Sequence, residues 1–159
     1  MAPVPESVDV GASIPAGAAA ESILDGAVRP LIPERFSDDR GVLTPLQLGE
    51  LGFALARVFV VSAPGGAVRG GHAHRDVRQL FFRASGRIEV EFRHRGATTR
   101  LTLDEERPAV LVEPGVWAQQ TYLVDGATLI VFADGGYDRG EYMDHDRGTG
   151  DRGAGGGAS

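Results

Sequence analysis

The sequence contains no cysteine and no lysine among its 159 residues. The lack of cysteine excludes a disulfide, a thiol nucleophile and a thiolate metal site, and it leaves the redox state of the compartment open. All 16 basic residues are arginine, which excludes a Schiff-base lysine and covalent amine catalysis. No apolar run approaches the roughly 20 residues that span a bilayer, and the N-terminus lacks the basic segment of a signal peptide. We therefore expect a soluble, cytoplasmic protein with no membrane partner.

The sequence also lacks an excess of basic over acidic residues. The formal net charge is -6 and the pI is near 5.2, so nucleic acid is not an expected partner. An anionic small ligand stays possible where arginines gather locally. The content of 42% hydrophobic and 24% charged residues is typical of one globular domain. We predict a disordered N-terminal tail over residues 1–26, a single domain over residues 27–147 and a disordered glycine-rich tail over residues 148–159.

Between these tails the chain shows short β-rich runs separated by turn residues, which is typical of a sandwich or barrel. A helical turn or two is expected only over Pro45–Leu55. Neither βαβ alternation nor a glycine-rich phosphate loop is present, so Rossmann and P-loop folds are set aside. The predicted strands are Arg57–Ser62, Gln79–Phe82, Arg87–Arg93, Thr98–Leu103, Ala109–Val112, Gln119–Leu123 and Thr128–Ala133.

Turn chemistry and alternation support this all-β interpretation. Apolar and polar residues alternate strictly over Arg87–Arg93, so Ile88, Val90 and Phe92 are predicted to face the core of an antiparallel sheet. Four predicted turns each separate two apolar runs. They are Ala63-Pro64-Gly65-Gly66, His94-Arg95-Gly96, Glu113-Pro114-Gly115 and Val124-Asp125-Gly126.

The most informative stretch is Gly70-Gly71-His72-Ala73-His74. Residues i and i+2 of a strand share a face, so His72 and His74 are predicted to point in the same direction. Imidazole titrates near neutral pH and also binds metals. The pair therefore indicates either proton transfer or a metal site.

The wider spacing resembles the first motif of the cupin superfamily. Four residues separate His74 from Gln79 and six more lead to Gly86, with Gln79 in place of the usual carboxylate. The resemblance implies an all-β double-stranded β-helix, or jelly-roll barrel. In metal-binding cupins a further histidine follows a Pro-x-Gly turn, whereas the segment after Pro114 here carries Trp117 and two glutamines. Neutral amides are poor ligands for a divalent ion, so metal-free proton transfer is the better hypothesis and no metal or other cofactor is expected.

A narrower set of motifs resembles the nucleotide-sugar 3,4-ketoisomerases of deoxysugar biosynthesis, over roughly residues 29–146. The motifs are Asp39-Arg40-Gly41, Arg69-Gly70-Gly71-His72-Ala73-His74, Gln79, Gly86, Leu103-Asp104, Pro114 with Trp117, Tyr137-Asp138 and Glu141-Tyr142.

This resemblance implies an enzyme that moves the carbonyl of a dTDP-linked 4-keto-6-deoxyhexose from C4 to C3 through an enediol, without a redox cofactor. It also implies a homodimer. His72 and His74 are the candidate acid and base. The candidate substrate-binding residues are Arg69, Arg57, Gln79, Trp117 and Tyr122.

One departure from the family pattern concerns the strand that begins Arg57-Val58. In the family this strand continues with tyrosines that help to line the pocket, whereas here it reads Phe59-Val60-Val61. A chain that works in the same way would have to rely on its histidines or recruit Tyr122 or Tyr137.

Three alternatives stay open. A 3,5-epimerase would use the same fold and a similar ligand, and a cupin that binds nucleotide-sugar without catalysis could assist a partner such as a glycosyltransferase. The third alternative is a metal-dependent cupin such as a dioxygenase. Outside the pair, His94 and His145 are expected to be solvated.

Overall fold

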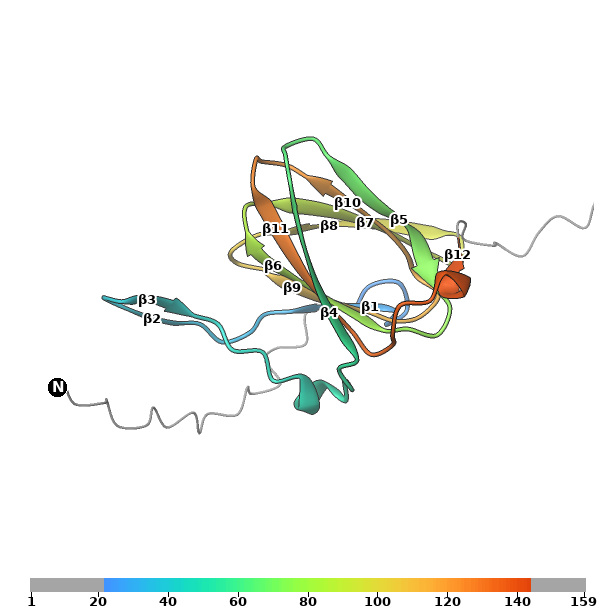
Figure 1. Cartoon of the computed structure of the whole chain (residues 1–159), viewed down its shortest axis with the longest axis horizontal. Helices are drawn as coiled ribbons and strands as arrows, with labels where there is room; N and C mark the ends of the chain where they lie inside the picture. Colours follow the sequence, from blue (N-terminus) through green and yellow to red (C-terminus); the bar gives the residue numbers. More distant parts are fainter. Residues whose placement is uncertain (1–21, 144–159) are drawn as a thin grey trace, which may run out of the picture.

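The computed structural model describes residues 22–143, and they form a jelly roll of two five-stranded antiparallel sheets. Figure 1 shows the two sheets facing each other and a small hairpin projecting from the body. One sheet has the order β1-β9-β6-β11-β4, and the other has the order β12-β5-β10-β7-β8. The predicted all-β cupin fold is confirmed. The strands are β1 (Val28–Leu31), β2 (Phe36–Asp38), β3 (Gly41–Leu43), β4 (Arg57–Ala63), β5 (Val68–His74), β6 (Gln79–Ser85), β7 (Ile88–His94), β8 (Ala97–Leu103), β9 (Ala109–Val112), β10 (Trp117–Tyr122), β11 (Ala127–Ala133) and β12 (Tyr142–Met143).

The core lies between the two sheets and follows from period-two patterning. On β7 the side chains of Ile88, Val90 and Phe92 are fully buried, as their alternation predicts. They meet residues of the opposite sheet such as Phe81 and Val131. The burial of large apolar side chains of this kind contributes about 1.5–3 kcal/mol each. This core therefore holds the two sheets face to face.

All seven predicted strands are present, and their ends differ by up to three residues. The histidine segment forms β5, as its extended backbone indicates. The expected helical turn is a single 3-10 turn over Leu48–Leu51. The sequence prediction missed β1, β2, β3 and β12, which have at most four residues each and are too short for a period to emerge.

The four predicted turns are present, and one of them fixes the histidine strand. The amide of Gly115 donates to the carbonyl of His74 over 2.7 Å. Gly115 has a φ of +82°, which glycine adopts without strain. The turn at the end of β9 thereby holds the end of β5 on which His74 lies.

The outer face of the first sheet carries a second apolar cluster. Leu80, Leu111 and Phe53 are buried there, and Leu48 and Leu51 of the 3-10 turn pack against them. The segment between β3 and β4 therefore covers part of this face. The hairpin of β2 and β3 pairs only within itself and carries exposed apolar side chains.

The predicted domain, residues 27–147, contains most of the described residues, which are 22–143. Inside the predicted N-terminal tail, Ile23 pairs with Val28 through two backbone hydrogen bonds and packs against the core. The remainder of that tail, up to residue 21, and the predicted C-terminal tail lie outside the described residues, as does His145. Within residues 22–143, no helix has the length and apolar character needed to cross a membrane.

Candidate active site

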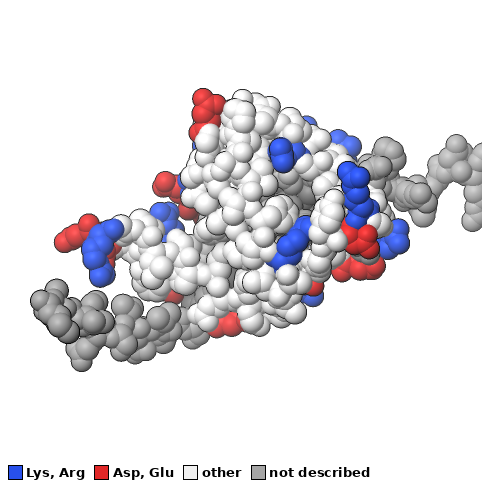
Figure 2. Space-filling model, in the orientation of Figure 1, with Lys and Arg blue, Asp and Glu red and all other residues white. Residues whose placement is uncertain are grey.

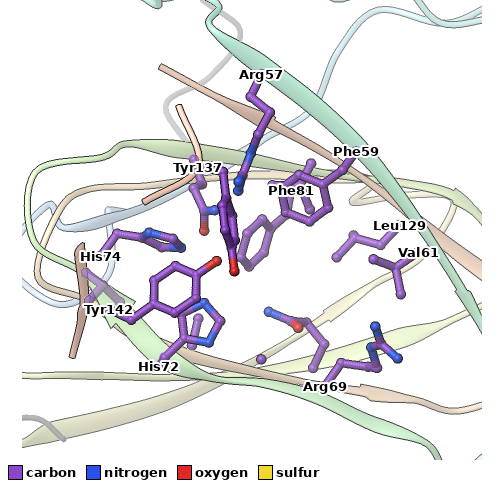
Figure 3. Close-up of a pocket in the computed structure, with 16 residues that line it drawn as sticks. Arg57, Phe59, Val61, Arg69, His72, His74, Phe81, Leu129, Tyr137 and Tyr142 are labelled. Carbon is purple, nitrogen blue, oxygen red and sulfur yellow. The ribbon is translucent and has the colours of Figure 1, made fainter. Parts of the chain in front are cut away.

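A cavity of about 350 Å³ opens between the two sheets and collects most of the predicted site residues. His72, His74, Arg57, Arg69 and Gln79 all line it. Figure 2 shows the body of one face built mainly from uncharged residues, with arginines beside a hollow. Figure 3 shows the histidines on one side of the cavity and an apolar wall with Leu129 and Val61 opposite them. The predicted pair therefore lies in a concave site with polar and apolar sides.

A β-bulge in β5 brings Arg69 to the same face as the histidines. On β10, Ala118 pairs with His72 and the next residue pairs with Gly70, so Gly71 is an extra residue. Both glycines have positive φ, +77° at Gly70 and +82° at Gly71, as bulges with glycine commonly do. In a regular strand, residues three apart would face opposite sides. The two glycines of the motif are thus the reason why Arg69 and His72 share the cavity.

Gly70 has a second, steric reason to be glycine. A Cβ at this position would lie 2.7 Å from Oε1 of Gln120 and 2.8 Å from the carbonyl oxygen of Ala118. A substitution would therefore push β5 away from β10. Gln120 is a buried cavity residue that the sequence prediction missed.

His74 is held in its uncharged form. The side chain is only 8% exposed, and burial is the main cause that lowers its pKa from 6.5 to about 4. The charges of His72 and Arg57 lower the pKa further. At neutral pH this imidazole is therefore unprotonated and able to accept a proton. A proton on His72 therefore opposes a proton on His74.

Tyr142 joins the two histidines, although it was not among the predicted site residues. β12 pairs with β5 so that Tyr142 lies opposite His74. Its ring stacks on His72 with the centroids 4.3 Å apart, and it meets the ring of His74 edge-on at 5.0 Å. Tyr142 appears in the C-terminal motif of the sequence, but β12 has only two residues and gave no periodic signal.

Tyr137 and Arg57 lie at the mouth of the cavity. Tyr137 is 64% exposed, and its ring centroid is 6.1 Å from that of Tyr142. The guanidinium of Arg57 lies 4.7 Å from the ring centroid of Phe59 and 5.4 Å from that of Tyr137. Its Nε is buried and has no hydrogen-bond partner among the described residues. Arg57 therefore offers an unused donor next to the cavity.

Trp117 and Tyr122 do not line the cavity, in contrast to the expectation that they bind substrate. Residues 118 and 120 of β10 face inward, so Trp117 faces outward, where the guanidinium of Arg93 lies 4.2 Å from its ring centroid. Tyr122 does point inward, but it is fully buried in the core, and burial raises its pKa. Trp117 is excluded from the cavity because it lies on the outward-facing side of β10. Tyr122 is excluded because it is buried too deeply in the core.

The donor set is a poor fit to a metal ion. Apart from His72 and His74, the polar cavity residues are two glutamines, two arginines and two tyrosines, with no carboxylate. Within residues 22–143, no group of three or more His, Cys, Asp or Glu side chains could hold a metal. Divalent ions in proteins usually take three anionic or imidazole ligands. The arrangement suits an acid and base pair better than a metal centre.

The sequence is also similar to known proteins. The family described as "FdtA: WxcM-like, C-terminal" matches residues 31–148. The TDP-4-oxo-6-deoxy-alpha-D-glucose-3,4-oxoisomerase of Aneurinibacillus thermoaerophilus is 25% identical over 112 residues, which are 69% of this chain and 81% of that protein.

Two solved structures share the fold. QdtA, a sugar 3,4-ketoisomerase from Thermoanaerobacterium thermosaccharolyticum in complex with TDP, has a TM-score of 0.69 at 21% identity and covers 75% of this chain and 88% of its own. ChmJ, a 3'-monoepimerase from Streptomyces bikiniensis in complex with dTDP-quinovose, has a TM-score of 0.67 at 23% identity and covers 73% of this chain and 68% of its own.

Proposed function

The chain belongs to the FdtA family (WxcM-like, C-terminal), and from this premise we propose that it is a nucleotide-sugar 3,4-ketoisomerase. The proposed substrate is a TDP-linked 4-keto-6-deoxyhexose, the kind of sugar named for the relative from Aneurinibacillus. The observation that carries the proposal is the pair His72 and His74, side by side in a cavity that arginines flank. The reaction needs no redox cofactor, because the carbonyl moves within one molecule.

His74 is the proposed base. Conversion of a 4-keto sugar to a 3-keto sugar begins when a base removes the proton on C3 and the electrons form an enediol. The lowered pKa of His74, about 4, keeps this imidazole free of a proton at neutral pH. The ring centroid of His72 lies 5.0 Å from that of His74, close enough for His72 to return a proton to C4 of the same sugar.

Arg57 and Arg69 are the proposed contacts for the anionic part of the ligand. Figure 3 shows them on different sides of the cavity. A guanidinium is always charged and presents several donors, which suits phosphate oxygens and a developing enediolate. Nε of Arg57 is buried without a partner among the described residues, so the side chain would have to turn for a ligand to reach that donor.

The apolar wall suits the deoxygenated part of the sugar. Leu129, Val131 and Phe81 reach the cavity from the first sheet, and Phe59 and Val61 extend the same wall along β4. An apolar surface accepts a methyl group and keeps water away from a reactive enediol. A hydroxyl at C6 would lose its hydrogen bonds there, so a 6-deoxy sugar is the better fit.

We also propose a homodimer. Phe36, Val42 and Leu43 of the projecting hairpin and Ile32 before it are exposed. Val58 and Val60 are exposed on the edge strand β4. Soluble monomers rarely leave so many large apolar side chains in water, and a second copy of the chain would bury them. Sedimentation equilibrium tests this, with a mass of twice the chain expected and the mass of a single chain contradicting it.

The test of the function is the product formed from TDP-4-keto-6-deoxyglucose. We expect nuclear magnetic resonance to show the carbonyl at C3 after incubation with the purified chain. A product altered at C3 or C5 with its carbonyl still at C4 would indicate an epimerase, a reaction for which the shared fold of ChmJ gives a reason to look. Binding without turnover would support a non-catalytic nucleotide-sugar-binding protein.

A further inference from the structure

The isomerisation moves two protons, from C3 to C4 and from O3 to O4, and the cavity residues limit which groups can move them. Arginine cannot give up a proton in a protein, and a glutamine amide neither gives nor takes one at neutral pH. No serine, threonine, aspartate or glutamate lines the cavity within residues 22–143. Four cavity residues can therefore transfer protons, namely His72, His74, Tyr137 and Tyr142.

We propose, on the basis of the isomerase function proposed above, that the hydroxyl of Tyr142 carries the proton between the two sugar oxygens. Tyr142 stacks on His72 and lies edge-on to His74, so a sugar carbon held at the histidines lies close to this phenol. Figure 3 shows the phenol oxygens of Tyr142 and Tyr137 directed toward the middle of the cavity. Tyr142 is thus assigned as a catalytic residue. The β4 residues that line the cavity, Arg57, Phe59 and Val61, have no phenol that could take this role.

Tyr142 suits this role better than the other tyrosines of the chain. Tyr137 is mostly exposed, and among the described residues its ring contacts Tyr142 and Arg57 rather than a histidine. Tyr122 is buried in the core, and burial raises its pKa, so it gives up a proton less readily. Tyr142 is half-buried and touches both imidazoles.

The proton transfers balance in two steps. In the first step His74 takes the proton on C3, the electrons of that bond form a double bond between C3 and C4, and Tyr142 protonates O4. The products are an enediol, an imidazolium and a phenolate. In the second step the phenolate takes the proton on O3, the carbonyl forms at C3, and protonated His72 gives its proton to C4. His74 then releases its proton to solvent and His72 takes one up, which restores the pair. The phenol is restored, and no net charge develops on the sugar.

The first test compares Tyr142→Phe with Tyr137→Phe. Phenylalanine keeps the ring that packs on His72 and removes only the hydroxyl. For Tyr142→Phe we expect kcat to fall by about a hundredfold or more, with the affinity for TDP changed by less than about threefold. We expect a smaller loss for Tyr137→Phe. A kcat for Tyr142→Phe within about threefold of wild type, or a larger loss for Tyr137→Phe, would overturn the assignment.

The second test keeps the hydroxyl and changes its acidity. A fluorinated tyrosine at position 142 has a phenol of lower pKa, so the alkaline limb of kcat against pH should move to lower pH. A purely structural role for Tyr142 would leave that limb in place. If the wild-type protein neither forms 3-keto sugar nor exchanges the C3 proton, both the proposed function and this role of Tyr142 are contradicted. If the wild type is active but the alkaline limb stays in place in the protein with fluorinated tyrosine, only the role of Tyr142 is contradicted.

Discussion

The ring of Tyr142 stacks on the imidazole of His72, with the ring centroids 4.3 Å apart and the ring planes 25° from parallel. β12 has two residues, and its register places Tyr142 opposite His74. The last described strand therefore closes the histidine side of the cavity with an aromatic ring. The ring also limits the space in which His72 can turn, which favours a fixed geometry for proton transfer.

Replacement of His74 by asparagine tests the base. Asparagine is similar in size and cannot accept a proton, so His74→Asn should lower kcat by about a hundredfold or more. His94→Asn is the matched control, because His94 lies at the end of β7 and does not line the cavity. The rate of 3-keto product formation is the measurement. A comparable loss for both variants would point to a general effect of histidine loss on folding.

The stability of the fold should depend on pH through His74. Its pKa is about 4 in the folded protein and 6.5 in the unfolded chain, so between these values the unfolded state binds more protons. The free energy of unfolding should therefore fall as pH decreases from about 6.5 to about 4, by up to about 3 kcal/mol from this residue.

His74→Asn isolates this contribution from those of the carboxylates. Urea denaturation at several pH values should show a smaller acid loss for His74→Asn than for the wild type. Above pH 6.5 the difference in unfolding free energy between the two proteins should be constant. Parallel curves over the whole acid range would contradict the burial of an uncharged His74.

Loss of either cavity arginine should weaken nucleotide binding. Arg57→Gln and Arg69→Gln each remove a charge-assisted donor, so the dissociation constant for TDP should rise about tenfold or more. Arg100→Gln is the control, because Arg100 lies on the second sheet and pairs with Glu91 outside the cavity. Calorimetric titration with TDP measures the effect. Equal losses for all three variants would indicate bulk charge rather than direct contact.

Trp117→Phe should lower stability and leave the substrate KM unchanged. Trp117 packs under the guanidinium of Arg93 on the outer face of the second sheet. Phenylalanine keeps part of the packing and weakens the cation–π contact, so we expect a loss of about 1 kcal/mol in unfolding free energy. Thermal denaturation and steady-state kinetics measure the two effects. A raised KM with unchanged stability would return Trp117 to the binding site.

Sequence patterns predicted most of the fold because a strand with one buried face has apolar residues at alternate positions. These positions show which side chains face the core. Ile88, Val90 and Phe92 show this directly, since all three are buried as their alternation indicates. The short strands β1, β2, β3 and β12 have too few residues to show this alternation.

The site was predicted in part for a similar reason. His72 and His74 share a face by simple alternation, whereas Trp117 was assigned by resemblance and strand parity turns it outward.

Other features of the site depend on contacts between distant segments, and a sequence pattern does not record such contacts. The bulge at Gly71 that brings Arg69 to the cavity is visible only in the pairing of β5 with β10. The position of Tyr142 depends on a pairing between segments about 70 residues apart in the sequence. The lowered pKa of His74 depends on burial from several strands at once.

Incubation of the purified protein with TDP-4-keto-6-deoxyglucose in deuterated water tests the proposed isomerase most directly. Acid and base transfer through exchangeable imidazoles predicts a 3-keto sugar that carries deuterium at C4, together with loss of the C3 proton from recovered substrate. Nuclear magnetic resonance reads both positions in one sample. Absence of both 3-keto product and C3 exchange, from folded protein that still binds TDP, would contradict the proposal.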